Sequence, residues 1–172
     1  MEFMARGTKT TEFLKECMSD ALIKLMSEKS IDKITITDIT DLADVGRSTW
    51  FRNFSTKSEA LSFKLVKLWE RYVSEYRDFH ISNAKVFFEF NYSIQNVLKT
   101  IYNAEMQHSI YDACCIVLLP QNDVTALDCY KCRFYAYGIY GLLDEWIKRD
   151  FKETPDEMAE LFSEIINDQK GL

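Results

Sequence analysis

The sequence contains few residues that interrupt helices, with only two prolines and five glycines among 172 residues. Sheets need turn residues at short intervals, so this shortage favours an all-α fold. No apolar run approaches the ~18 residues of a membrane-spanning helix. The first ten residues also lack the apolar segment of a secretory signal. We therefore expect a cytoplasmic protein that has no membrane partner.

Residues suited to catalysis are also scarce. Only His80 and His108 are available for acid–base chemistry, and no nucleophile, paired-carboxylate or phosphate-binding glycine motif is recognisable. The cysteines number five and lie in apparent helices, which favours reduced thiols over a disulfide framework. Cys129 and Cys132 form a C-x-x-C pair, but a zinc site needs about four ligands and no second pair is present. We predict no enzyme, no metal site and no cofactor.

The net charge of −6 is unevenly distributed along the chain. Residues 1–80 carry 13 basic and 13 acidic side chains, whereas residues 81–172 carry 8 and 14. All of the acidic excess therefore lies in the C-terminal half. Contact with phosphate groups depends on local charge, so nucleic acid is not excluded as a partner of the N-terminal half.

Apolar periodicity predicts a series of helices. The first covers residues 11–28, where apolar side chains recur every four residues. Thr35 and Asp38 have the spacing of a capping box, which begins a short helix that ends near Ala43. After a turn at 44–46 comes a second short helix over 47–53, and a long helix that begins near Ser55. Its pattern weakens at 78–83, which we predict as a domain boundary, and further helices are expected at 85–103, 107–119, 124–149 and from 155 onward.

The second short helix separates apolar from polar side chains. Its expected core, together with that of the preceding helix and turn, consists of Ile39, Ala43, Val45, Trp50 and Phe54. The outward side chains are Arg47, Ser48, Thr49, Arg52 and Asn53. Arginine can hydrogen-bond guanine edges, asparagine can pair with adenine, and the threonine methyl can contact thymine. We expect Thr37 and Lys57 at phosphate groups. The pattern predicts a helix-turn-helix that reads the major groove of double-stranded DNA.

Nearly thirty residues of this segment resemble the DNA-binding domain of the TetR family of bacterial transcriptional regulators. The matching positions are Thr35, Asp38, Ile39, Ala43, Val45, Thr49, Phe54, Lys57, Ala60 and Leu61. Thr40 replaces the usual alanine, Asp44 the turn glycine and Gly46 the usual serine cap. Phe51 stands where the family has a tyrosine whose hydroxyl bonds a phosphate, so Phe51 retains only the ability to pack on the DNA backbone.

The resemblance implies a homodimer in which a C-terminal domain binds a small-molecule effector and resets the spacing of two reading helices. The expected division is a DNA-binding domain at 1–54, a connecting helix at 55–80 and a helical ligand-binding and dimerisation domain at 81–172. Residues 138–147 and 154–157 are also similar to a TetR subgroup that includes regulators of dihydroxyacetone kinase. In some of that subgroup the effector is expected to be a protein or to be absent.

An apolar face on the last two helices supports the dimer independently. The predicted interface residues are Tyr135, Gly138, Ile139, Leu142, Trp146, Met158, Leu161, Phe162 and Ile165. The alternative is that this face belongs only to the core of the single chain.

Candidates for an effector pocket are large side chains between the middle helices, mostly aromatic and some with polar tips, with core packing as the alternative for each. They are Trp69, Phe88, Tyr92, Tyr102, His108, Tyr111 and Cys115. The sequence thus predicts a homodimeric DNA-binding regulator, most simply a repressor released by a signal. The rival is a helical protein-interaction module or a thiol-based sensor.

Overall fold

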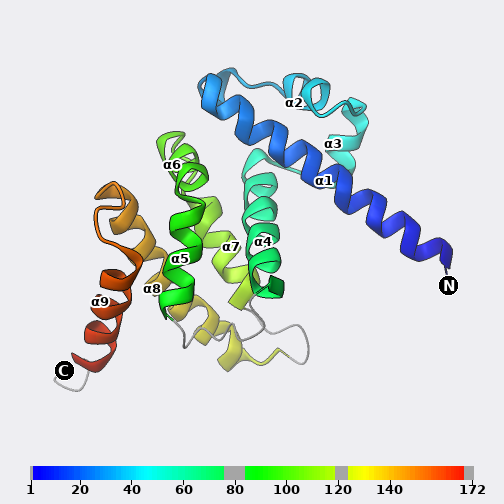
Figure 1. Cartoon of the computed structure of the whole chain (residues 1–172). Coiled ribbons are helices and arrows are strands. Elements are labelled where there is room, and N and C mark those ends of the chain that lie inside the picture. Colours follow the sequence, from blue (N-terminus) through cyan, green and yellow to red (C-terminus); the bar gives the residue numbers. More distant parts are fainter. Residues whose placement is uncertain (1, 76–83, 119–123, 169–172) are drawn as a thin grey trace.

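The computed structural model describes residues 2–75, 84–118 and 124–168, with side chains over 10–72, 84–118 and 124–167. Every regular element in these ranges is a helix, as the sequence predicts (Figure 1). The predicted domain boundary at 78–83 lies outside the described residues. The elements are α1 (Glu2–Glu28), the 3-10 turn η1 (Ile31–Lys33), α2 (Ile36–Leu42), α3 (Arg47–Asn53), α4 (Lys57–Glu75), α5 (Ala84–Ser93), α6 (Gln95–Asn103), α7 (His108–Leu118), α8 (Ala126–Lys148) and α9 (Pro155–Asp168).

Helices α1 to α3 form a small head at one end of the molecule, and α4 leads from it into the remaining helices (Figure 1). The head is held together by side chains that are almost fully buried, among them Met18, Leu22, Ile39, Trp50 and Phe54. The predicted core positions Ala43 and Val45 are partly buried and pack against this cluster.

Helix α4 is joined to α1 on one side and to α7 on the other. Its N-terminus is capped by Thr56, whose hydroxyl accepts a hydrogen bond from the Glu59 N–H at 3.1 Å. Three cations of α4 pair with acids of α1: Lys64 with Asp20, Lys67 with Glu12, and Arg71 with Glu16. Towards α7, the buried Ser62 hydroxyl donates to the Ser109 carbonyl at 3.1 Å. Helix α4 therefore links the head to the body through both polar and apolar contacts.

The predicted single helix at 85–103 is two helices, α5 and α6, which meet at Ile94. Near the junction, the Ser93 hydroxyl donates to the Phe90 carbonyl at 2.6 Å, and the Ile94 N–H donates to the same carbonyl at 3.3 Å. Side-chain hydroxyls that compete for helix carbonyls bend or interrupt a helix. Apolar periodicity does not detect this competition, because it is carried by a polar residue within an otherwise continuous pattern.

In the rest of the body, α5 packs against α9 and α7 against α8, while α6 packs against α1 and α8. Trp146 lies in its core, with its ring edge-on to Phe88 at a centroid distance of 5.5 Å. Its indole N–H donates to the Glu153 carbonyl at 3.0 Å, which fixes the connection between α8 and α9. Thr154 then caps α9, since its hydroxyl accepts a hydrogen bond from the Glu157 N–H at 3.3 Å.

Candidate DNA-binding surface

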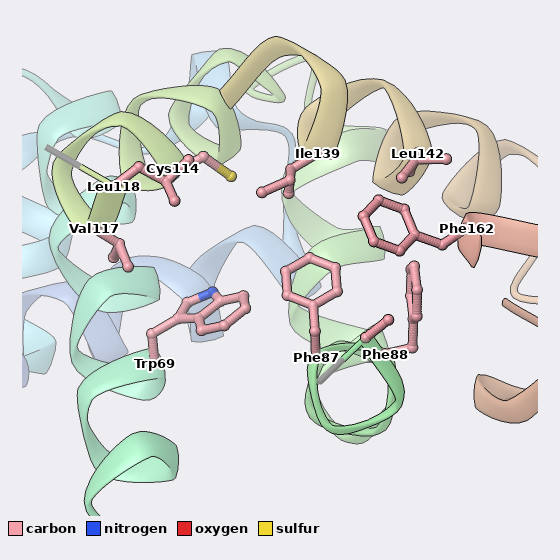
Figure 2. A pocket seen from close by; sticks show the side chains of 10 residues that line it. Trp69, Phe87, Phe88, Cys114, Val117, Leu118, Ile139, Leu142 and Phe162 are labelled. Atoms are coloured by element: carbon pink, nitrogen blue, oxygen red, sulfur yellow. The ribbon is translucent and has the colours of Figure 1, made fainter. Parts of the chain in front are cut away.

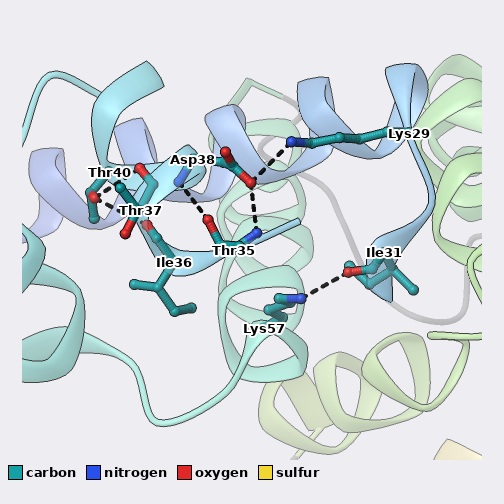
Figure 3. Close-up of polar contacts among 8 residues, drawn as sticks. All are labelled: Lys29, Ile31, Thr35, Ile36, Thr37, Asp38, Thr40 and Lys57. Carbon is teal, nitrogen blue, oxygen red and sulfur yellow. Dashed lines mark hydrogen bonds and ion pairs between the residues drawn. The ribbon is translucent and has the colours of Figure 1, made fainter. Parts of the chain in front are cut away.

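Helix α2 begins with the predicted capping box. The Thr35 N–H donates to Asp38 Oδ2 at 2.7 Å, and the Asp38 N–H donates to Thr35 Oγ1 at 3.1 Å (Figure 3). Lys29 Nζ, from the end of α1, donates to the same Asp38 oxygen at 2.9 Å. The backbone bond from Thr35, followed by the bond from Lys29, lowers the pKa of Asp38 to about 2. The carboxylate is therefore charged at neutral pH and fixes the start of α2 against α1.

The turn between α2 and α3 uses Asp44 in the left-handed conformation, with φ of 52°. Aspartate tolerates this conformation better than most residues, so it replaces the glycine expected in the family. The Val45 N–H donates to the Thr40 carbonyl at 2.9 Å and closes the turn. Thr40 is buried, and its hydroxyl donates to the carbonyls of Ile36 at 3.0 Å and Thr37 at 3.1 Å within the helix. The Thr40 hydroxyl, which stands where the family has alanine, thus finds its hydrogen-bond acceptors within α2.

Helix α3 has one buried side and one exposed side. Trp50 is 1 % exposed, and its ring lies 5.2 Å from that of Phe54 between centroids, so these two aromatics hold the helix to the head. Arg47, Ser48 and Arg52 are exposed on the other side. This seven-residue helix therefore presents a polar side to solvent, while its apolar side packs against the head.

Contacts within α3 orient these exposed side chains. The Arg47 guanidinium lies over the Phe51 ring at 5.5 Å, and Phe51 is itself 61 % exposed. Arg52 Nη2 donates to the Ser48 hydroxyl at 3.0 Å. Asn53 and Thr49 are half-buried, and Asn53 Nδ2 donates to the Thr49 carbonyl at 2.7 Å. Among the residues that the structure describes, no carboxylate forms an ion pair with Arg47 or Arg52, so these contacts position the guanidinium groups without neutralising them.

The two predicted phosphate contacts lie on either side of α3 in the chain. Thr37 is exposed in the first turn of α2, where helix N–H groups favour an anion. Lys57 is half-buried at the start of α4, and its ammonium donates to the Ile31 carbonyl at 2.8 Å (Figure 3). This bond gives Lys57 a structural role in joining α4 to η1, which the sequence did not predict, in addition to its predicted phosphate contact.

The predicted effector residues do not gather in one place. Trp69 and Phe88 line a partly open apolar cavity of about 50 Å³ with Ala84, Phe87, Cys114, Val117, Leu118, Ile139, Leu142 and Phe162 (Figure 2). Tyr92 instead packs against Trp146 and meets Phe151 edge-on, and Tyr102 packs against the main core. His108 is exposed, Tyr111 bonds Arg133, and Cys115 lines a separate groove. The predicted tyrosine, histidine and cysteine side chains therefore do not line this cavity. Most of its lining consists of aliphatic and phenyl groups, which periodicity alone assigns to a core.

The predicted interface residues separate into two groups. Trp146 and Met158 are 1 % and 6 % exposed, so they belong to the core of the single chain, and Ile139, Leu142 and Phe162 are partly buried against it. Tyr135, Gly138, Leu161 and Ile165 lie on the surface. Sequence periodicity identified the apolar faces of α8 and α9 but combined the inward and outward sides of each helix.

The surface side of α8 carries further large apolar residues that the sequence did not single out. Leu127, Tyr130 and Phe134 are 60 %, 77 % and 69 % exposed, and they continue into Gly138 and Gly141 at helical spacing. Beside them, α9 exposes Ile166 in addition to Leu161 and Ile165. An apolar stripe of this extent is unusual on a monomer and typical of an interaction surface.

In the described part of the chain, no three histidine, cysteine or acidic side chains come together in a way that would hold a metal ion. None of the described helices combines the length and apolar character needed to cross a bilayer.

Comparison with known proteins identifies the chain. A family model for the C-terminal region of TetR-type transcriptional regulators matches residues 69–168, more than half of the chain. A comparison with curated proteins gives no significant match. Among solved structures, Lin0861 from Listeria innocua superposes with a TM-score of 0.71 at 13 % identity, over 93 % of this chain and 92 % of that one. This likeness shows a shared fold, and the resemblance to regulators of dihydroxyacetone kinase stays a prediction. From the family match and the helix-turn-helix described above, the chain belongs to the TetR family of transcriptional regulators.

Proposed function

We propose that the protein binds operator DNA as a homodimer and inserts α3 of each subunit into the major groove. The observation that carries this proposal is the division of α3 between the buried Trp50 and the exposed Arg47, Ser48 and Arg52. Arg47 and Arg52 read base edges, and the first turn of α2 with Lys57 contacts phosphates. The net charge of −6 does not oppose this role, because the acidic excess lies after residue 80.

The partner subunit binds along the exposed apolar stripe of α8 and the adjoining residues of α9. Leu127, Tyr130 and Phe134 would be shielded from water there, and the two glycines allow a second helix to approach closely. A dimer places two reading helices one helical turn of DNA apart, about 34–36 Å. One seven-residue helix alone gives little specific affinity, so the dimer is required for operator recognition.

The regulatory signal acts on α4, which connects the cavity to the head. Trp69 of α4 forms part of the cavity wall, and Lys57 begins the same helix. Twelve residues separate them, a distance of about 18 Å along a helix axis. A cavity of about 50 Å³ is much smaller than the 300–1,000 Å³ of typical ligand sites. An effector must therefore select a conformation in which the cavity is larger, and it releases DNA by its preference for that state.

The direct test is recovery of genomic DNA fragments with the purified protein, followed by affinity measurements on the recovered site. We expect a site with two-fold symmetry and binding that weakens as salt rises. Arg47→Ala should cost about 1–3 kcal/mol on the preferred site and reduce discrimination among base variants. Lys152→Ala, an exposed basic residue remote from α3, is the matched control. A folded dimer that shows no salt-dependent DNA binding would rule out the proposal.

A further inference from the structure

Four cysteines lie where α7 meets α8. Cys114 and Cys115 are in the second half of α7, while Cys129 and Cys132 are in the first turns of α8. The contact between the helices is built from Tyr111, Cys114 and Ala136. The C-x-x-C spacing in the sequence draws attention to Cys129 and Cys132, yet in the structure Cys129 is exposed while Cys132 is buried against α7.

The partner of Cys132 in the structure is Cys115. The Cys132 thiol donates to the Cys115 carbonyl at 3.4 Å, and the two side chains are also in hydrogen-bonding contact. On its other side, Cys115 Sγ accepts a hydrogen bond from Arg133 Nη1 at 3.3 Å. The same guanidinium nitrogen donates to the Tyr111 hydroxyl at 2.8 Å, which holds it in place.

Cys115 is also accessible from solvent. It is half-buried and lines an open groove of about 510 Å³ between the head and the body, together with Arg133, Asp112 and Ser62. A small oxidant can therefore reach this thiol without any opening of the core. Cys114, which is buried, and Cys132, which faces Cys115, are shielded by comparison.

We propose that Cys115 and Cys132 form a peroxide-sensitive dithiol that closes into a disulfide between α7 and α8. Cys115 reacts first, because it lines the groove that admits hydrogen peroxide and has the Arg133 guanidinium beside its sulfur. The Cys115 sulfur attacks one peroxide oxygen, the O–O bond breaks, and the products are a sulfenic acid and water. Cys132 then attacks the Cys115 sulfur, and the sulfenic oxygen leaves as a second water. Two thiols and one hydrogen peroxide thus give one disulfide and two waters.

The surroundings of the other thiols support this order. Burial raises the pKa of Cys114 to about 12, so it stays protonated and does not compete for the oxidant. Burial, followed by the nearby Cys115, also raises the pKa of Cys132. Cys132 therefore reacts poorly with peroxide itself, but it is in place to attack a sulfenic acid that forms on the adjacent Cys115.

This inference does not depend on DNA binding, and it is tested on the purified full chain. The protein is treated with hydrogen peroxide, free thiols are alkylated, and disulfide-linked peptides are mapped by mass spectrometry. We expect a Cys115–Cys132 bond in the parent and in the matched control Cys129→Ser. In Cys132→Ser, the reaction should stop at a sulfenic acid on Cys115 that dimedone captures. Failure of these two thiols to link in the parent, or a bond between Cys129 and Cys132 in their place, would overturn the proposal.

A second measurement tests the role of the guanidinium. Arg133→Gln should slow the first oxidation of Cys115 several-fold at neutral pH, because it removes the positive charge beside the Cys115 sulfur. Equal rates for parent and variant at neutral pH would remove Arg133 from the mechanism. Initial capture of sulfenic acid on Cys129 or Cys132 would contradict the assigned order.

Discussion

Replacing Gly138 and Gly141 with alanine should have opposite effects on the single chain and on its dimer. Both glycines lie inside α8, and beyond the adjacent residues and the backbone of that helix, a Cβ built on either would meet none of the described atoms within 4 Å. Alanine is favoured over glycine in a helix interior by about 1 kcal/mol, so the double variant should stabilise the isolated subunit by about 2 kcal/mol. Packing among the described residues therefore gives no reason for two glycines at these positions.

The dimer provides that reason if a partner helix crosses the glycines. Each added methyl would then intrude into a close contact, and overpacking of this kind costs about 1–3 kcal/mol. In a two-fold dimer every substitution occurs twice. We expect the dissociation constant of the dimer to rise at least tenfold, which corresponds to about 1.4 kcal/mol.

Sedimentation velocity over a concentration series gives the dissociation constant, and thermal unfolding at high dilution gives the stability of the subunit. Phe134→Ser is a useful comparison, because it removes an exposed apolar contact from the same stripe without changing a glycine. It should weaken the dimer and leave the subunit about as stable as before. A double alanine variant that is more stable and dimerises as tightly as the parent would refute the placement of the interface.

Three other substitutions test the head. Lys57→Met should lower the free energy of unfolding in urea by about 1 kcal/mol, because it removes the hydrogen bond to the Ile31 carbonyl. It should also reduce the slope of log affinity for DNA against log salt concentration by about one unit. A change in the slope alone would show that the carbonyl bond is dispensable. Phe51→Tyr should strengthen operator binding by about 1 kcal/mol in a titration by fluorescence anisotropy, because it restores a hydroxyl that can reach a phosphate; unchanged affinity would place Phe51 away from the DNA backbone. The pKa of Asp38 is about 2 when folded and about 4 when unfolded, so its contribution to stability is present above pH 4 and lost as the pH falls towards 2. In urea unfolding between pH 2 and 6, Asp38→Asn should show a weaker acid dependence than the parent, and identical pH profiles would contradict this assignment.

The head could be predicted from the sequence in detail because its signals are local. A capping box depends on two residues three apart, and the turn needs one residue that tolerates positive φ. Thr35, Asp38 and Asp44 take these roles in the structure. The buried positions Trp50 and Phe54 were also identified, because an exposed polar face leaves only one side of a seven-residue helix for packing.

The body could be predicted only in outline. Periodicity shows which side of a helix is apolar, but it does not show whether that side packs within the chain or against another molecule. For this reason the sequence pattern places Trp146 with surface residues of α8, whereas in the structure its indole N–H donates to the Glu153 carbonyl inside the subunit. The proximity of Cys115 and Cys132 was also beyond prediction, because it depends on how α7 and α8 are aligned rather than on any sequence spacing.

The contacts between α1 and α4 determine how motion would pass through this molecule. Three ion pairs and the buried side chains between the two helices oppose sliding of α4 along α1, so we expect the two helices to move together. Over the ~28 Å length of a 19-residue helix, a tilt of about 5° displaces one end by about 2–3 Å relative to the other. Small rearrangements around Trp69 would therefore swing the whole head, with no need for the chain to bend between its two parts.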